Sequence, residues 1–182
     1  MKRPLPLIAL AVVMLVLAGT AHAQFNTTGT TTLSLTVAAE ASLRIDTTTT
    51  TLATSGSLFN NDYTGTTNYT YKIRTTKSGG SGAITLKVTS DFSPSPGGPS
   101  VGAPPSTGDA LTYTCSITSP GTACTGSLTA STTAGTSVST FGADAKSALG
   151  GNTGSVGWNL TNDPQYSTGT YTAVVTFTIS AT

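Results

Sequence analysis

The only two cysteines of the chain have a spacing that predicts a disulfide. Cys115 and Cys124 stand in LTYTCSITSPGTACTGSL, on either side of a Ser-Pro-Gly turn. A redox or catalytic thiol would need a Cys-x-x-Cys spacing or a nearby histidine, and this stretch has neither. In an exported protein, two cysteines separated by a short loop are expected to be oxidised. We therefore predict a structural disulfide between Cys115 and Cys124.

The acidic residues are scattered singly along the sequence and do not form a catalytic pair. They are Glu40, Asp46, Asp62, Asp91, Asp109, Asp144 and Asp163. Glycosidase chemistry needs two carboxyls at a defined separation, and zinc needs cysteine or histidine ligands. Calcium near Asp163, or in the 60–62 turn, would lack the spaced acids of a calcium loop. We predict no catalytic residues, no metal and no cofactor, so the protein is not expected to be an enzyme.

The only histidine, His22, lies in a segment with the anatomy of a secretory signal. Met1 to Ala23 begins with two basic residues, continues through an apolar run and ends in Ala-His-Ala, a small-x-small cleavage site. Cleavage would leave a mature chain from Gln24 without the usual general base of Ser-His or Cys-His catalysis. The apolar run is too short to span a bilayer comfortably. We predict a protein that does not span a membrane and is secreted to the periplasm, the cell surface or the extracellular space.

Three basic residues form a candidate ligand patch. Residues 69–74 and 84–89 alternate apolar with polar side chains, and the glycine-rich KSGGSG that links them predicts a β-hairpin. On such a hairpin Lys72, Arg74 and Lys87 would point outward together. An acidic polysaccharide is the ligand that this patch would bind. The alternative is a solvated outer face, which the small number of charges favours.

The overall composition indicates a single all-β domain. The 182 residues include eight basic and seven acidic side chains, a balance that gives no support for nucleic-acid binding. Threonine, glycine and serine dominate the sequence after the signal, and β-branched threonine suits the outer face of a strand. We predict one domain over residues 24–182, long enough to bury a core.

The clearest strand signal lies in residues 151–182. Apolar residues alternate with small or polar ones over 156–160 and again over 171–179. This period-two pattern predicts half-buried antiparallel strands, joined here as a hairpin. Trp158 could stack on a sugar, but its place in the alternation predicts a core position. The predicted core row is Trp158, Leu160, Tyr171, Val175, Phe177 and Ile179.

A second alternating row follows the signal closely. Every odd position from 33 to 45 is apolar and most even positions are polar. At about 3.3 Å per residue this row is longer than an ordinary strand, so we expect a break near Ala38. Leu33, Leu35 and Val37 would then either begin the domain's own sandwich or be donated to the sheet of a neighbouring subunit.

One long loop interrupts the predicted strands. Asp91 to Asp109 contains five prolines and no periodicity, which predicts either a functional excursion or a mobile tether. The remaining pattern accommodates about eight or nine strands, and an antiparallel β-sandwich of the Greek-key, immunoglobulin-like kind is the predicted arrangement. A jelly roll is the alternative.

The C-terminal motif resembles the ending of bacterial secreted Ig-like surface proteins. Trp158-Asn159-Leu160 is followed by STGTYTA over 167–173 and by VTFTI over 175–179. This pattern is similar to the last strands of WxL-type cell-wall-binding domains and, more loosely, to pilin subunits of the chaperone–usher kind. The resemblance implies a non-catalytic surface or matrix protein.

These observations give two functional hypotheses. The first is a secreted, threonine-rich structural or adhesive subunit of the cell surface, with a fimbrial-type subunit as its sharper form. Its partners would be copies of itself or other surface subunits, joined by strand addition. The alternative is a carbohydrate- or cell-wall-binding module that holds cell-surface polysaccharide through Lys72, Arg74, Lys87 or exposed tyrosines.

Overall fold

The computed structural model describes residues 28–56, 58–94 and 96–182. The predicted signal, residues 1–23, and the expected mature start at Gln24 lie outside this range. The chain divides into two units, Met1–Thr36 and Val37–Thr182. In the first unit, residues 28–36 have no regular secondary structure and their side chains are exposed. All of the strands described below lie in the second unit.

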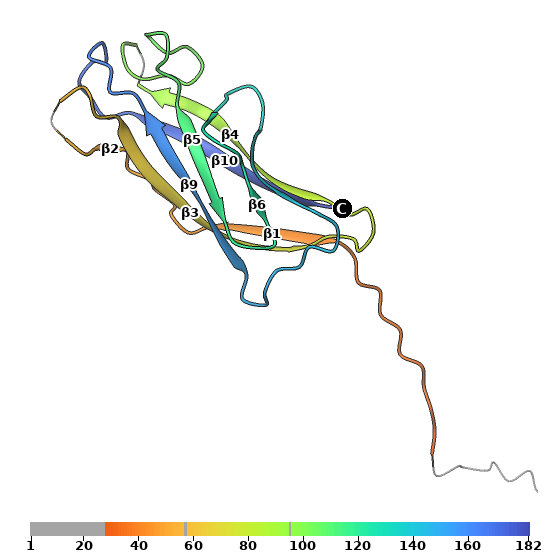
Figure 1. The fold of residues 1–182 in the computed structure, drawn as a ribbon. Coiled ribbons are helices and arrows are strands. Elements are labelled where there is room, and N and C mark those ends of the chain that lie inside the picture. Colours follow the sequence, from red (N-terminus) through yellow and green to blue (C-terminus); the bar gives the residue numbers. More distant parts are fainter. Residues whose placement is uncertain (1–27, 57, 95) are drawn as a thin grey trace, which may run out of the picture. The chain divides into compact units, whose positions relative to one another are not determined.

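The strands form two antiparallel sheets (Figure 1). One sheet has the order β1-β3-β9-β5-β7, with β2 paired to the start of β3, and the other has the order β10-β4-β8-β6. Among the described residues there is no helix. The bounds are β1 Glu40–Ile45, β2 Ala53–Thr54, β3 Tyr63–Arg74, β4 Gly82–Ser93, β5 Thr112–Ile117, β6 Thr122–Ala123, β7 Leu128–Thr129, β8 Thr136–Phe141, β9 Asn152–Leu160 and β10 Thr172–Ala181.

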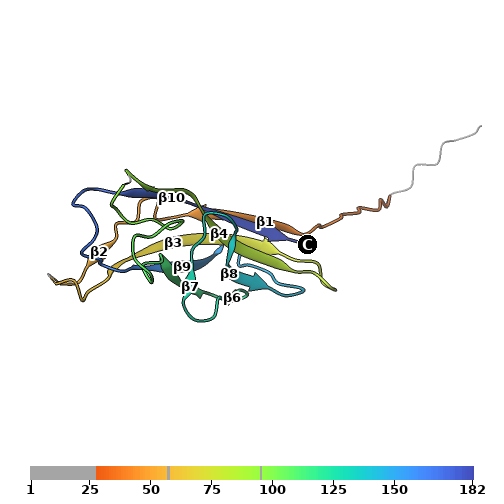
Figure 2. The ribbon, with the colours of Figure 1, turned by 90° about the horizontal axis from the view of Figure 1, so that it is seen from above.

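The two sheets pack face to face over one apolar core. In Figure 2, β1 and β10 lie at one margin of the sandwich and β7 and β6 lie at the other. Because side chains alternate between the faces of a strand, each long strand contributes every second residue to this core. The centre of the core comes from β3, β4 and β9: Tyr69, Tyr71, Ile73, Ile84, Leu86, Val88, Val156, Trp158 and Leu160. The predicted all-β sandwich is therefore confirmed. Its immunoglobulin-like, Greek-key detail stays a prediction.

Two large aromatic residues of the core have hydrogen-bond partners for their polar atoms. The Trp158 indole N–H donates to Thr67 Oγ1 at 2.8 Å, and the Tyr71 hydroxyl donates to the Thr118 carbonyl at 2.5 Å. Each of these bonds replaces a hydrogen bond to water that the group loses on burial. A buried polar group without such a bond would lower the stability of the fold. The predicted core positions of Trp158 and Leu160 are confirmed, because both side chains are buried.

Both predicted hairpins are wrong in their pairing. β3 and β4 lie in different sheets, and so do β9 and β10. β3 pairs with β1 and β9, whereas β4 pairs with β8 and β10. The connections 75–81 and 161–171 therefore cross from one sheet to the other. The alternation gives the correct inward-facing residues. Two consecutive amphipathic strands can bury these residues whether they pair in one sheet or lie in the two opposite sheets of a sandwich.

The proline-rich connection is folded around one carboxylate. β4 continues through Asp91 to Ser93, so the loop begins later than the sequence pattern suggests. The Asp91 carboxylate accepts hydrogen bonds from Ser100 Oγ and from the amides of Val101 and Gly102, at 2.7, 2.7 and 3.0 Å. Burial acts to raise the pKa of Asp91, but these donors outweigh burial and lower the pKa below its usual value.

The core predicts a large difference between two substitutions on the β10-β4-β8 sheet. Leu86 is buried between the sheets, and Leu86→Ala should cost about 2–5 kcal/mol of unfolding free energy because it leaves a cavity. Val174, on the outer face of β10, is 55% exposed, and Val174→Ala should change stability by about 0.5 kcal/mol or less. Urea unfolding of the oxidised protein measures both. Equal costs would contradict the assigned core.

Candidate functional site

The alternating row 33–37 is exposed. The side chain of Leu33 is 91% exposed and that of Leu35 is 86% exposed, and Val37 is also mostly exposed. Regular strand structure begins only at Glu40, so the expected break near Ala38 agrees with the structure. Large aliphatic side chains are usually buried, and several exposed together indicate an interaction site more often than one alone.

The last strand of the sandwich has one free edge. β10 is ten residues long and pairs with β4 only, so its other edge is hydrogen-bonded to no described strand. Its inner row is half-buried, in contrast to the fully buried row of β4 beside it. Val175, Phe177 and Ile179, which were predicted to be core residues, pack against the core from this half-covered position. Tyr171 precedes β10 and its hydroxyl donates to the Ser167 carbonyl at 2.8 Å, so it belongs to the loop.

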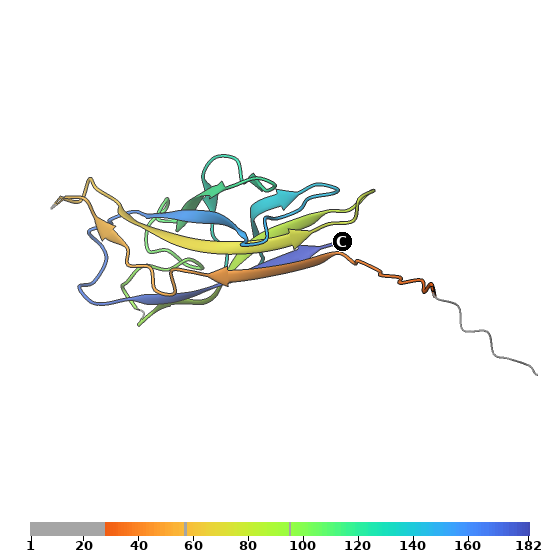
Figure 3. The same cartoon turned by 90° about the horizontal axis from the view of Figure 1, so that it is seen from below.

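The first strand has the same half-covered character. β1 pairs with β3 only, and its inner row of Ala41, Leu43 and Ile45 is half-buried. β1 and β10 lie side by side at one margin of the sandwich, in different sheets and without a hydrogen-bonded ladder between them (Figure 3). We call this place the β1–β10 margin. An edge strand presents unpaired N–H and C=O groups, to which another strand can add.

Polar contacts fix both strands of the margin. Arg74 on β3 donates to the Ala38 carbonyl at 2.8 Å and pairs with Glu40 at 3.1 Å, which holds the start of β1. At the end of β1, the Thr70 hydroxyl and then Arg44 lower the pKa of Asp46. These ion pairs are largely exposed, so each contributes little stability and mainly sets position.

The C-terminal end of β10 is tied to the β3–β4 connection. The Thr182 amide donates to the Ser81 carbonyl at 2.8 Å, and the Thr76 amide donates to the Thr182 carbonyl at 2.9 Å. Together with the β4 ladder, these bonds hold β10 in place while its outer edge stays free. The free edge is therefore a fixed feature of the sandwich.

The predicted basic patch is not assembled. Lys72 and Arg74 lie on β3, whereas Lys87 lies on β4, and these strands belong to opposite sheets. The inner rows of the two sheets face each other, so outward side chains of β3 and β4 point away from each other. The prediction that the three residues point outward together required β3 and β4 to form a hairpin. Because they do not, this prediction is wrong.

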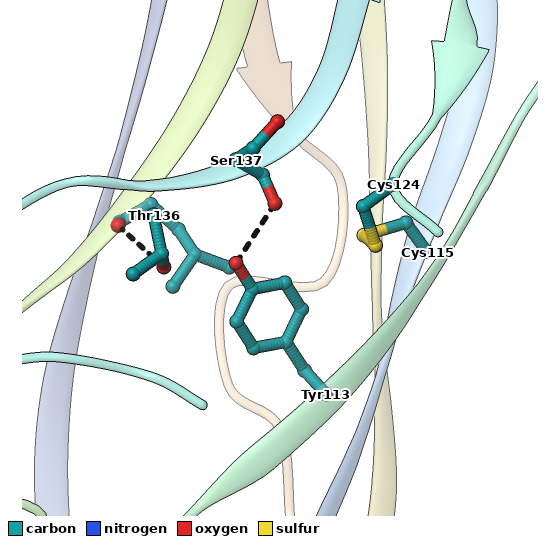
Figure 4. Close-up of a disulfide and its surroundings, with 6 residues drawn as sticks. Tyr113, Cys115, Cys124, Thr136 and Ser137 are labelled. Atoms are coloured by element: carbon teal, nitrogen blue, oxygen red, sulfur yellow. Dashed lines mark hydrogen bonds between the residues drawn. A yellow bond between two sulfur atoms is a disulfide. The ribbon is translucent and has the colours of Figure 1, made fainter. Parts of the chain in front are cut away.

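The predicted disulfide is confirmed. Cys115 on β5 is bonded to Cys124, which directly follows β6, and their Cα atoms are 5.5 Å apart. The Cys124 amide donates to the Val138 carbonyl of β8 at 3.0 Å, which attaches Cys124 to the second sheet. The disulfide therefore joins one sheet to the other. Figure 4 shows it beside Tyr113, whose hydroxyl donates to the Ser137 carbonyl at 2.8 Å.

Over residues 28–56, 58–94 and 96–182, no three histidine, cysteine, aspartate or glutamate side chains gather as a metal site would require. Burial raises the pKa of Tyr69 to about 12, which keeps its phenol neutral. Within the same ranges, no helix is long and apolar enough to cross a membrane.

A comparison of this chain with protein-family models, curated proteins and solved structures finds no match.

Sequence reasoning missed the half-covered state of the β1–β10 margin. The apolar rows of β1 and β10 alternate as strictly as those of a fully buried strand. Alternation predicts which face of the sheet a side chain lies on, but it does not predict how completely that side chain is covered. The one available signal was the unusual length of the 33–45 row, which indicated more apolar positions than a single strand can bury.

The disulfide gives a direct stability prediction. The double variant Cys115→Ser/Cys124→Ser should lose about 2–3 kcal/mol of unfolding free energy, because the unfolded chain regains the freedom of the short closed loop. Urea unfolding of the oxidised wild-type protein and of the variant measures the difference. A reductant should lower the wild-type stability to that of the variant and leave the variant unchanged. A variant as stable as the oxidised wild type would contradict the prediction.

Proposed function

We propose that this chain is a secreted structural or adhesive subunit of the cell surface that assembles by strand addition, as a fimbrial-type subunit would. The observation that carries the proposal is the exposed apolar row Leu33, Leu35 and Val37 in a chain whose β10 has a free ten-residue edge and a half-buried inner row. The row supplies a strand, and the edge of another copy accepts it.

The energetics of addition favour this pairing. Burying an aliphatic side chain of this size stabilises by about 1.5–3 kcal/mol each. Leu33, Leu35 and Val37 share one face of an extended segment, with Ser34 and Thr36 on the other. In strand addition, backbone hydrogen bonds to the edge supply affinity, and every second side chain enters the apolar surface. This segment has the required pattern, since alternate positions are apolar and polar.

Two observations support the proposed location outside the cytoplasm. The first 23 residues read as an export signal, and the inter-sheet disulfide needs an oxidising compartment to persist. The near balance of charges gives no attraction to nucleic acid. The wall-binding alternative loses its main argument, because Lys72 and Lys87 lie on opposite sheets.

A double substitution in the exposed row tests the proposal. In the exported, oxidised protein, Leu33→Asp/Leu35→Asp should abolish assembly into oligomers, because a carboxylate cannot enter an apolar groove without a large desolvation cost. Size exclusion with light scattering measures the mass of the wild type and the variant. Leu149→Asp is the matched control, since Leu149 is 94% exposed but lies outside the row, and it should leave assembly unchanged.

A synthetic peptide of residues 28–37 provides a second arm of the test. Added in excess, it should occupy the free edge and convert oligomers to capped monomers, whereas the same peptide with aspartate at positions 33 and 35 should have no effect. A wild-type protein that stays monomeric at every concentration would overturn strand addition. So would oligomers that Leu33→Asp/Leu35→Asp leaves intact.

A further inference from the structure

Two buried aspartates meet at the end of the sandwich where three connections lie. Asp109 ends the proline-rich connection between β4 and β5, and Asp163 lies in the connection between β9 and β10. Asp109 is 4% exposed and Asp163 is 8% exposed. The two carboxyls lie close enough for each to shift the pKa of the other. The two connections also meet where the Gln165 side chain donates to Ser106 Oγ at 2.9 Å. Carboxylates are seldom buried without a compensating charge, so this contact needs an explanation.

The donors around the pair are unequally shared. Asp163 accepts a hydrogen bond from the Gln165 amide at 2.7 Å. The Ser106 hydroxyl lies beside Asp163 and lowers its pKa, and Ser106 Oγ accepts a hydrogen bond from the Gln165 side chain at 2.9 Å. Asp109 Oδ2, in contrast, is buried and has no donor of good geometry. The Tyr166 hydroxyl is also buried beside it without a partner of good geometry. Asp163 is thus prepared to carry negative charge, and Asp109 is not.

The charged and titratable groups that face the pair are few. Tyr166 adjoins Asp109, and Tyr63 at the start of β3 lies near Tyr166. Burial and then the neighbouring Asp109 raise the pKa of Tyr166, so its phenol is neutral at ordinary pH. Among the described residues, the three ion pairs are those of Arg44, Arg74 and Lys146, and none involves Asp109 or Asp163. No basic side chain is therefore placed to neutralise two carboxylates.

We propose that Asp109 and Asp163 share a single proton and that this proton latches the proline-rich connection to the β9–β10 connection. Two carboxylates in contact cannot both ionise without strong repulsion, so one keeps its proton. With the proton on Asp109, the carboxyl becomes a donor to Asp163, and the buried Oδ2 of Asp109 no longer lacks a partner. This latch does not depend on strand addition.

The latch is closed over a window of pH. Burial and then the neighbouring Asp163 raise the pKa of Asp109, so its contribution to stability is present at low pH and is lost as the pH rises through that raised value. The Ser106 hydroxyl, followed by the Gln165 amide, lowers the pKa of Asp163. Its contribution is present above the unfolded value and is lost as the pH falls through the lowered one. Between the two folded values the pair holds one proton.

Amide hydrogen exchange of the oxidised full chain measures the latch. The Gln165 amide donates to the Asp163 carboxylate, so its protection reports the closed state. After correction for the intrinsic exchange rate, this protection should fall about tenfold for each unit of pH above the pKa of the pair. In Asp109→Asn the side-chain amide replaces the protonated carboxyl as donor, so protection should not change over the same range. Asp62→Asn, which removes one carboxylate from another connection, should keep the wild-type profile.

Several outcomes would overturn the latch. One is a pH profile of Asp109→Asn that follows that of the wild type. Another is an unchanged profile in Asp163→Asn, which keeps the acceptor but removes the like charge. Protection of the wild type at high pH by added Ca²⁺, absent in Asp109→Asn, would assign the pair to a metal ion and overturn the shared proton.

Discussion

A single layer of apolar side chains between two sheets is the contact on which the sandwich depends. Every second residue of β3, β4 and β9 enters it, and the Trp158 indole N–H finds a partner inside it in Thr67. Hydrophobic burial is not directional, so the layer itself does not select strand partners. Hydrogen-bonded ladders and the inter-sheet disulfide determine which strands are neighbours, which hydrophobic burial alone does not.

The inner side chains are less completely buried at the β1–β10 margin than at the centre of the layer. The proposed function depends on this difference. Residues of β4 in the layer are covered from all sides, whereas those of β10 have β4 on one side and a free edge on the other. A half-covered row next to unpaired backbone groups is the surface to which an extended apolar segment can add. The exposed row that includes Leu33 and Leu35 has the matching alternation.

Polar side chains organise the long connections. Asp91 gathers backbone amides and folds the proline-rich segment, and the Asp109 and Asp163 carboxyls join that segment to the β9–β10 connection. Loops need such devices because their backbone groups have no ladder partners. The acidic residues that appeared scattered along the sequence are thus brought together in one case, through tertiary contact between two loops.

The sequence by itself determined the all-β class, the faces of the strands, the disulfide and the break near Ala38, because period-two alternation and cysteine spacing are local properties. Only the tertiary structure decided which strands pair, that Lys72 and Lys87 lie on opposite sheets, and that Asp109 meets Asp163. A connection can return a strand to its own sheet or cross it to the other one, with the same residues facing inward in both cases. That choice depends on the summed burial and pairing of segments far apart in the chain, which local patterns do not contain.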